Sequence, residues 1–323
     1  MDTAQRASER TEQPADDGAG APLDISVVIP CLNEEASIAE CVRRGLATIR
    51  SAGLAGEVVV VDNGSHDRST ELATEAGARV VREERKGYGS AYLRGFHEAR
   101  GELIFMGDAD GTYPFEDLPR FLDAMGGGAE FVLGDRFAGT MEPGAMAWDR
   151  RIGNHLLSGM LRLMFRPGVH DAHCGLRLIS KRAVDRMSLS STGMEFASEM
   201  LISAKAAGVR MAEIPIDYAA RADLNQSKLN SVPDGIRHVR YMLSAAPAGW
   251  VVVPGAIMVA GGLALVLAGG AVLKVLGVVL MAVGAGAAIA RLVSRPLAGV
   301  ASRRSRAAIA REPERAHRSR TVL

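Results

Sequence analysis

Residues 103–114 read LIFMGDADGTYP, and the rest of the chain is best understood outward from them. The apolar run 103–106 is typical of a buried strand, and it ends at Gly107 in two carboxylates, Asp108 and Asp110. Residues two apart in an extended segment point to the same side, so both carboxylates can face one ion. Such oxygen ligands suit Mg²⁺ or Mn²⁺. We therefore expect a metal–diphosphate site at this point.

Other apolar, β-branched runs, at residues 25–30 and 57–61, alternate with helical patterns. This alternation predicts an α/β fold in which helices cover a mostly parallel sheet. Ligands of such sheets bind beyond the carboxyl ends of the strands. The polar residues at three predicted strand ends are therefore expected to line one crevice: Asn33 and Glu34, Asp62 to Ser65, and Asp108 to Asp110.

Composition excludes several other classes of protein. The formal net charge of +1 over 323 residues gives no global electrostatic reason to expect a nucleic-acid partner. The three cysteines have no metal-binding spacing and read as reduced thiols. No glycine follows the first predicted strand, so a dinucleotide site is disfavoured. Residues 1–22 lack an apolar core, which predicts a disordered leader and no signal peptide.

The apolar residues gather near the C-terminus. Residues 247–267 carry no charge, and residues 272–289 carry only Lys274, so each run is about long enough to cross a bilayer, ~20 residues. The alternative is a pair of buried helices in a soluble fold. Arginines flank both runs, and the positive-inside rule then puts both termini in the cytoplasm. The expected organisation is a leader (1–22), a cytoplasmic catalytic domain (23–246), a two-helix transmembrane hairpin (247–293) and a basic tail (294–323) in a multi-pass protein of the cell membrane.

Six stretches carry a resemblance to a known family. They are VVIPCLNEE (27–35), VVVDNGSHD (59–67), GDADGTYP (107–114), GDRF (134–137), DAHCGLR (171–177) and GMEFASEM (193–200). Together they resemble family 2 inverting glycosyltransferases with a GT-A fold, of the polyprenyl-phosphate (dolichyl-phosphate) glucose or mannose synthase type. This resemblance implies a Rossmann-like, mixed but mostly parallel sheet, followed here by the two transmembrane helices.

The resemblance also implies roles for individual residues. The nucleotide-sugar would be held by Pro30, Asn33, Glu34, Asp62 and Asp108, and the metal, Mg²⁺ or Mn²⁺, by Asp108 and Asp110. Catalysis would involve Asp108, Asp110 and Arg136. The acceptor phosphate would be bound by Arg136, Arg177, Arg221 and Lys228. Some synthases have a further polar ligand where this chain has Thr112, which leaves the third metal ligand open.

A lipid phosphate and a saccharide hydroxyl differ as acceptors in whether they need a general base. A lipid monophosphate is already an anion and needs no strong base, whereas a saccharide hydroxyl does. Glu195, Glu199 and Asp171 are the carboxylates that could serve as that base, although ion pairing explains them equally well. His173 is expected to be a hydrogen-bonded structural residue.

The leading hypothesis is transfer of a hexose from UDP-glucose or GDP-mannose to a polyprenyl phosphate at the cytoplasmic face of the membrane. The alternatives are a glycolipid or diacylglycerol-type acceptor, a nucleotidyltransferase, and a non-catalytic membrane adaptor with a vestigial sugar-nucleotide fold. The intact Asp108 and Asp110 pair argues against the adaptor. The sequence leaves the sugar open and is compatible with a homo-oligomer.

Overall fold

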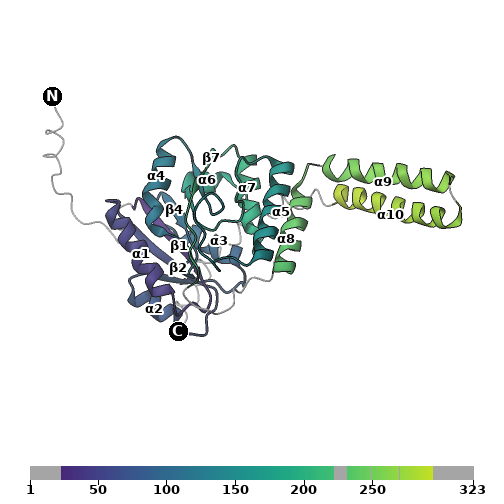
Figure 1. The fold of residues 1–323 in the computed structure, drawn as a ribbon. Coiled ribbons are helices and arrows are strands. Elements are labelled where there is room, and N and C mark those ends of the chain that lie inside the picture. Colours follow the sequence, from purple (N-terminus) through teal and green to yellow (C-terminus); the bar gives the residue numbers. More distant parts are fainter. Residues whose placement is uncertain (1–22, 222–230, 248, 269, 294–323) are drawn as a thin grey trace, which may run out of the picture.

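The computed structural model describes residues 23–221, 231–247, 249–268 and 270–293. The predicted leader, the predicted basic tail and Lys228 lie outside these described residues. An α/β domain is followed by a pair of helices that extends away from it (Figure 1).

One mixed sheet forms the centre of the α/β domain. Within the described residues it has seven strands in the order β3-β2-β1-β4-β6-β5-β7. Their bounds are β1 Ile25–Cys31, β2 Gly56–Asp62, β3 Arg79–Arg82, β4 Leu103–Met106, β5 Phe131–Asp135, β6 Arg177–Ser180 and β7 Met211–Pro215. Strands β1 to β4 pair in parallel, β6 is antiparallel to both β4 and β5, and β7 is parallel to β5. The predicted mixed, mostly parallel sheet is confirmed.

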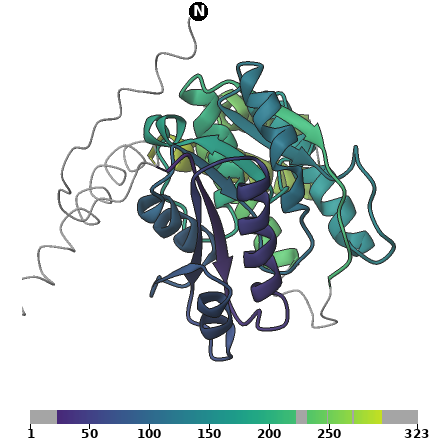
Figure 2. The same ribbon diagram turned by 90° about the vertical axis from the view of Figure 1, so that its left-hand side faces the viewer.

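Helices cover both faces of the sheet (Figures 1 and 2). The alternation of side chains along a strand explains why both faces are apolar. In β2, Val58 and Val60 pack into one core with α1 (Ile38–Ser51), while Val59 and Val61 pack into a second core with α3 (Tyr88–Glu98). The remaining helices of the domain before α8 are α2 Ser69–Glu75, the short 3₁₀ helix η1 Phe115–Asp117, α4 Leu118–Gly126, α5 Trp148–Phe165, α6 Lys181–Arg186 and α7 Phe196–Ala206.

Strand β6 was not predicted from the sequence. It is only four residues long, it begins with an arginine, and α6 follows it directly. Its pairing partners are distant in the chain, with Arg177 opposite Met106 of β4 and opposite Leu133 of β5. Local pattern carries little information about so short a segment, because its stability comes from non-local pairing.

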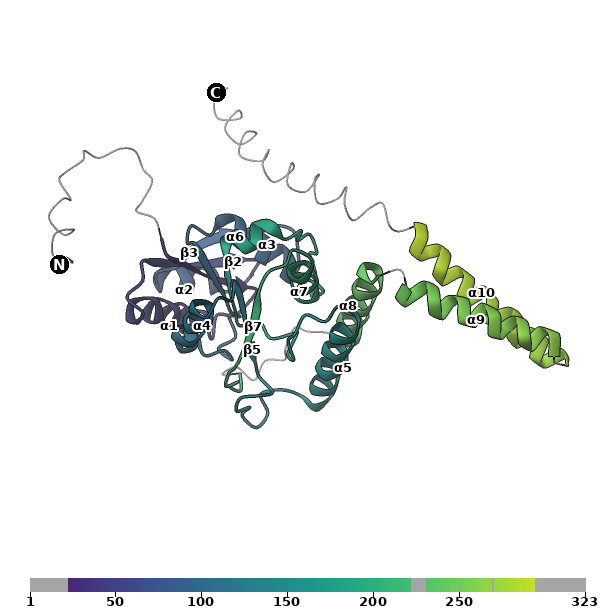
Figure 3. The same cartoon turned by 90° about the horizontal axis from the view of Figure 1, so that it is seen from above.

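Four helices form the far end of the molecule. Helices α5 and α8 (Ser231–Ala245) lie side by side at one edge of the domain, and α9 (Gly249–Ala268) and α10 (Ala271–Val293) pack together and extend from that edge (Figures 1 and 3). Helices α9 and α10 can approach each other closely because glycines lie at their interface. A Cβ atom at Gly262 would lie only 2.5 Å from the carbonyl oxygen of Gly277.

No helix in the described part of the chain combines the length and the apolar character that crossing a membrane requires. The two C-terminal helices are thus present where the sequence predicted them, but their prediction as membrane spans is not confirmed.

Candidate functional site

A cavity of about 700 Å³ opens beyond the carboxyl ends of the strands. Its sheet end is lined by Pro30, Glu34, Asn63, Asp108, Asp110 and Arg136, which follow or end strands β1, β2, β4 and β5. Its other end is lined by residues of α5 and α8. The predicted convergence of strand ends on one crevice is therefore what the fold produces.

Two carboxylates sit at the sheet end. Asp108 follows β4 and accepts a hydrogen bond from the hydroxyl of Tyr88, 3.2 Å away. Asp110 accepts from the hydroxyl and the backbone N–H of Thr112, at 2.7 and 3.1 Å. Burial, and secondarily the nearby charge of Asp110, raise the pKa of Asp108 to about 7. The two carboxylates therefore repel each other in a poorly solvated position, and a bound cation would stabilise the ionised form of both.

Arg221 supplies part of that positive charge. Its Nε donates to Asp110 Oδ2 at 3.0 Å, and its Nη2 lies 3.5 Å from Glu34 Oε1. Arg221 was predicted to bind the acceptor phosphate, and the structure places it in the cavity, directly against the predicted metal ligand. A guanidinium bridging two carboxylates here shows that this end of the cavity accommodates a cation.

Arg136 follows β5 and is almost fully buried. It makes a bidentate pair with Asp171, with Nε–Oδ2 and Nη2–Oδ1 distances of 2.7 and 2.9 Å. Its guanidinium also lies over the ring of Tyr218, 5.2 Å from the centroid. Asp171 has no exposed side-chain surface, and although burial opposes ionisation, Arg136 holds the pKa of Asp171 below its usual value. Arg136 thus lines the cavity as predicted, but its charge is already paired.

Asn33 and Asp62, predicted to contact the nucleotide, are not part of the cavity lining among the described residues. Instead they shape the loops after β1 and β2. Asn33 adopts φ 50° and its side-chain oxygen accepts from the N–H of His66 at 2.8 Å. Asp62 accepts from the N–H of Ser65, also at 2.8 Å. Asn63, the residue after Asp62 and one of the strand-end residues expected to line the crevice, does line the cavity.

The prediction that Arg177 binds the acceptor phosphate is not supported by its position. Arg177 is 1% exposed, and its guanidinium donates to the backbone carbonyls of Cys174 and Ala172, at 2.7 and 3.0 Å. Arg177 is the first residue of β6, its side chain is buried, and it is absent from the described cavity lining. Lys228, the fourth predicted phosphate ligand, lies outside the described residues.

Two of the three candidate bases, Glu199 and Asp171, are committed to other contacts. Glu199 is 2% exposed and accepts hydrogen bonds from the N–H groups of Ser190 and Ser191. Asp171 is paired with Arg136. Glu195 accepts from the N–H of Gly193 at 3.3 Å through Oε1, whereas its Oε2 is buried without a hydrogen-bond partner among the described residues. Glu195 is not among the described residues that line the cavity.

Several lining residues were missed by sequence reasoning. Lys86 precedes α3 and Tyr88 is its first residue, and neither was predicted to belong to the site. His238 of α8 lines the cavity and shares a hydrogen bond with Ser198 at 2.8 Å. His173, expected to be structural, lies within 3.4 Å of Ser158 and Ser198, and burial together with His238 lowers its pKa. No local signal in the sequence connects α8 with the strand ends.

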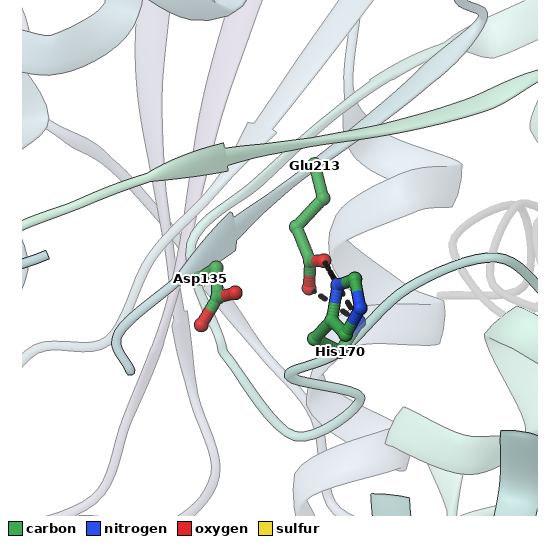
Figure 4. Close-up of side chains that lie close together, drawn as sticks. All are labelled: Asp135, His170 and Glu213. Atoms are coloured by element: carbon green, nitrogen blue, oxygen red, sulfur yellow. Dashed lines mark hydrogen bonds and ion pairs between the residues drawn. The ribbon is translucent and has the colours of Figure 1, made fainter. Parts of the chain in front are cut away.

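A second group of potential metal ligands comprises Asp135, His170 and Glu213, whose ligand atoms lie within 4.8 Å of one another (Figure 4). Glu213 accepts from the backbone N–H groups of His170 and Asp171, each at 2.7 Å, and lies 2.9 Å from His170 Nδ1. Asp135 accepts from the N–H of Phe137 at 2.9 Å. Through these hydrogen bonds the group holds in place the loop that carries Asp171.

Comparison with known proteins adds a family context to this geometry. A family model described as glycosyl transferase family 2 matches residues 26–188. The low-salt glycan biosynthesis hexosyltransferase Agl6 of Haloferax volcanii is 46% identical over 246 residues, which cover 75% of this chain and 59% of that protein. A dolichyl-phosphate hexose transferase of the same organism is 34% identical over 214 residues, covering 66% of this chain and 89% of that protein.

Among solved structures, the fold is similar to glucosyl-3-phosphoglycerate synthase from Mycobacterium tuberculosis in complex with Mn²⁺, uridine diphosphate and glucosyl-3-phosphoglycerate. The TM-score is 0.54 at 22% sequence identity, and the alignment covers 69% of this chain and 80% of that one. At this level of identity the likeness concerns the fold alone.

Proposed function

The chain belongs to glycosyl transferase family 2, and on that basis we propose that it transfers a hexose from a nucleotide-sugar, UDP-glucose or GDP-mannose, to a polyprenyl phosphate at the cytoplasmic face of the membrane. The observation that carries the proposal is the continuous cavity. It joins the carboxylates Asp108 and Asp110 to the wall formed by α5 and α8, next to the apolar helix pair. A charged donor and a lipid acceptor can approach the same point from opposite ends.

At the donor end, Asp108 and Asp110 would hold Mg²⁺ or Mn²⁺. The fit is favourable because both carboxylates line the cavity, the pKa of Asp108 is raised to about 7 by burial and by Asp110, and a cationic group of Arg221 already sits against Asp110. When bound, a divalent ion neutralises charge that develops on a leaving diphosphate. Pro30, Glu34 and Asn63 stand beside this position and are proposed to face the nucleotide.

The other groups of the cavity suit an acceptor that is already an anion. Glu199 and Asp171 are held by hydrogen bonds and an ion pair, so neither is free to take a proton from a hydroxyl. Arg136 and Arg221 line the cavity, and guanidinium binds phosphate through paired N–H donors. Arg136 already pairs with Asp171 and Arg221 with Asp110, so a phosphate would share these guanidinium groups with the two carboxylates. The proposed role of the two arginines is to hold two negatively charged substrates together while the phosphate oxygen attacks the sugar.

Helices α9 and α10 are proposed to associate with the membrane that contains the acceptor. They expose large apolar side chains along their length, including Leu267, which is 77% exposed, and Val272, which is 81% exposed. Such surface is unfavourable in water. Residues 23–246 are proposed to act as the catalytic domain and residues 247–293 as the membrane-associated hairpin.

The decisive experiment offers a panel of labelled nucleotide-sugars to the full chain, purified in detergent, with polyprenyl phosphate and Mn²⁺. We expect one sugar to appear on the polyprenyl phosphate, and about a hundredfold or greater loss of transfer with Asp110→Asn at equal folded protein. Glu116→Gln, a change outside the cavity, is the matched control and keeps full turnover. Product only on a glycolipid or diacylglycerol lipid would overturn the acceptor, and no turnover with any sugar would favour a binding adaptor.

A further inference from the structure

Two histidines in the wall of the cavity have no part in the function proposed so far. His173 follows Asp171 by two residues, His238 belongs to α8, and both line the cavity. Their rings are in edge-to-face contact, with centroids 4.6 Å apart and planes inclined at 85°. Imidazole can donate one hydrogen bond and accept another, so the partners of the two rings decide what they offer to a ligand.

The two rings belong to one chain of hydrogen bonds. Oγ of Ser198 lies 2.8 Å from Nδ1 of His238 and 3.4 Å from Nε2 of His173. The other ring nitrogen of His173, Nδ1, lies 3.4 Å from Oγ of Ser158, which accepts the N–H of Ala172 at 3.2 Å. Neither serine is more than 1% exposed, so both hydroxyl groups depend on these partners. The chain links α5, α7 and α8 across the cavity wall.

Both histidines are neutral at pH 7. Burial, and after it the charge of Arg177, lowers the pKa of His238 to about 4. Burial also lowers the pKa of His173 well below its usual value. A neutral imidazole has one N–H donor and one acceptor nitrogen. Each ring therefore continues the chain in one direction, and that direction decides which group stands at its end.

The first member of the chain fixes its direction. Oγ of Ser158 accepts from Ala172, and among the described residues Nδ1 of His173 is the only acceptor within reach of the Ser158 proton. His173 then carries its own proton on Nε2 and donates it to Ser198, whose hydroxyl proton goes to Nδ1 of His238. His238 is left with its proton on Nε2.

We propose that the Nε2–H group of His238 donates to the phosphate of the lipid acceptor in the cavity, and that the chain through His173 and Ser198 holds His238 in this tautomer. No described residue is a hydrogen-bond partner of Nε2. This atom is also not among the enclosed side-chain atoms of the described chain that lack a partner, so it is open to the cavity that the ring lines. The inference rests on the proposed function, since it names a group that binds the proposed acceptor.

The surroundings of the chain favour an oxygen anion as its ligand. The backbone N–H of His173 donates to Oδ1 of Asp171 at 3.3 Å, and the same oxygen accepts from Arg136 at 2.9 Å. The chain therefore lies beside the guanidinium that is proposed to hold phosphate. Donors aligned in sequence polarise one another, which strengthens the last donor. A neutral donor also binds a phosphate oxygen without the cost of a further buried charge next to Arg136 and Arg177.

NMR of the full chain in detergent, labelled with ¹⁵N at histidine, reads the tautomer directly, because protonated and unprotonated ring nitrogens have different shifts. The signals of His238 are those that are lost in His238→Gln. We expect a protonated Nε2 and an unprotonated Nδ1, and a shift of the Nε2 signal when short-chain polyprenyl phosphate is added without donor or metal. His97 of α3, which is exposed and lies outside the cavity lining, is the internal control and should not respond.

Three outcomes of this experiment would overturn the proposal. In the first, the proton is on Nδ1 of His238, so that a lone pair faces the phosphate. In the second, Nε2 responds only to UDP-glucose or GDP-mannose with Mg²⁺, so that the ring contacts the donor. In the third, Nε2 does not respond although calorimetry shows that the polyprenyl phosphate binds. Absence of binding in calorimetry would refute the acceptor itself, and with it the proposed function.

Ser198 is a positioning residue with a signature of its own. Ser198→Ala removes the proton that Nδ1 of His238 accepts, so both tautomers of His238 should appear in the spectrum while circular dichroism shows an unchanged fold. Ser203→Ala, on the same helix but outside the cavity lining, is the matched control and should keep the single tautomer. A single Nε2–H tautomer in Ser198→Ala would overturn the role of the chain.

Kinetics distinguish a phosphate contact from a structural role. His238→Leu should raise the KM for polyprenyl phosphate about tenfold or more and leave the KM for the nucleotide-sugar unchanged, because a hydrogen bond to a charged group is lost. His238→Gln keeps an N–H donor and should recover most of the difference, while His97→Leu should change neither KM. An unchanged acceptor KM in His238→Leu would overturn the proposal, whereas absence of transfer by the unsubstituted chain would refute the proposed function.

Discussion

The buried pair of Arg136 and Asp171 allows a sharp prediction about stability. Asp171→Asn keeps the shape of the side chain but removes its charge. It leaves the guanidinium of Arg136, whose side chain is 6% exposed, without its counterion. The amide nitrogen of the new side chain also meets an N–H donor of Arg136, where a carboxylate oxygen now accepts at 2.7 or 2.9 Å. At least one of the two hydrogen bonds is therefore lost as well.

Breaking one partner of a buried ion pair costs about 3–5 kcal/mol, since an uncompensated charge remains in a medium that solvates it poorly. For a domain of this size, 1 kcal/mol lowers the melting temperature by about 2–4 °C, so we expect a decrease of roughly 10 °C. The effect depends on pH. Arg136 keeps the pKa of Asp171 below its ordinary value, so its contribution is fully present above the unfolded pKa, about 3.9, and is lost as pH falls through the folded pKa.

The assay is thermal unfolding of the full chain in detergent, followed by circular dichroism at pH 7. A double variant, Arg136→Met with Asp171→Leu, supplies the comparison, because replacing both partners by apolar groups leaves no unpaired charge. We expect the double variant to be more stable than Asp171→Asn alone. A melting temperature of Asp171→Asn within 2 °C of the unsubstituted chain, or a double variant as unstable as the sum of its single changes, would refute the reasoning.

Three further predictions concern the cavity and its surroundings. Asp110→Asn removes one carboxylate of the proposed metal pair and should lower Mn²⁺-dependent transfer by about a hundredfold or more, with circular dichroism showing an unchanged fold. Because the pKa of Asp108 is raised to about 7, its protonated fraction grows below that pH, and calorimetry at pH 6 and pH 8 should show weaker Mn²⁺ binding at pH 6; equal affinities would contradict the assignment. Arg177→Ala should lower the melting temperature by several degrees, since the carbonyls of Ala172 and Cys174 lose their donors, while the KM for the acceptor stays the same. A raised KM in an Arg177→Ala protein of unchanged stability would restore its role as a phosphate ligand.

Much of the fold was predictable because its strands are locally distinctive. The run Val58–Val61 is β-branched and buried throughout, which few structures other than the inside of a parallel sheet can accommodate. The acidic end of β4 was predictable for a similar reason: two carboxylates shortly after a buried apolar strand lie at the carboxyl end of the sheet. Strand β6 has no such signature, because its direction depends on pairing with β4 and β5, which lie far away in the chain.

The assignment of the arginines shows where local reasoning ends. Arg136, Arg177 and Arg221 all looked like cationic partners for phosphate, yet the fold gives each a different environment. Arg177 is enclosed by carbonyl groups, Arg136 is paired with a carboxylate 35 residues away, and Arg221 reaches across 111 residues to Asp110. A guanidinium binds whichever acceptors the fold brings to it, and the identity of those acceptors is not encoded near the residue.

The amino-acid sequence by itself determined the α/β class, the carboxylates Asp108 and Asp110 at a strand end, and the apolar C-terminal helices, because each depends on the order of neighbouring residues. Only the tertiary structure decided that α5 and α8 line the far end of the cavity, that Arg221 faces Asp110, and that α5 and α8 lie at the edge of the domain from which the hairpin extends (Figure 3). The physical reason is that side-chain burial, ion pairing and pKa are set by groups that become neighbours only when the chain has folded.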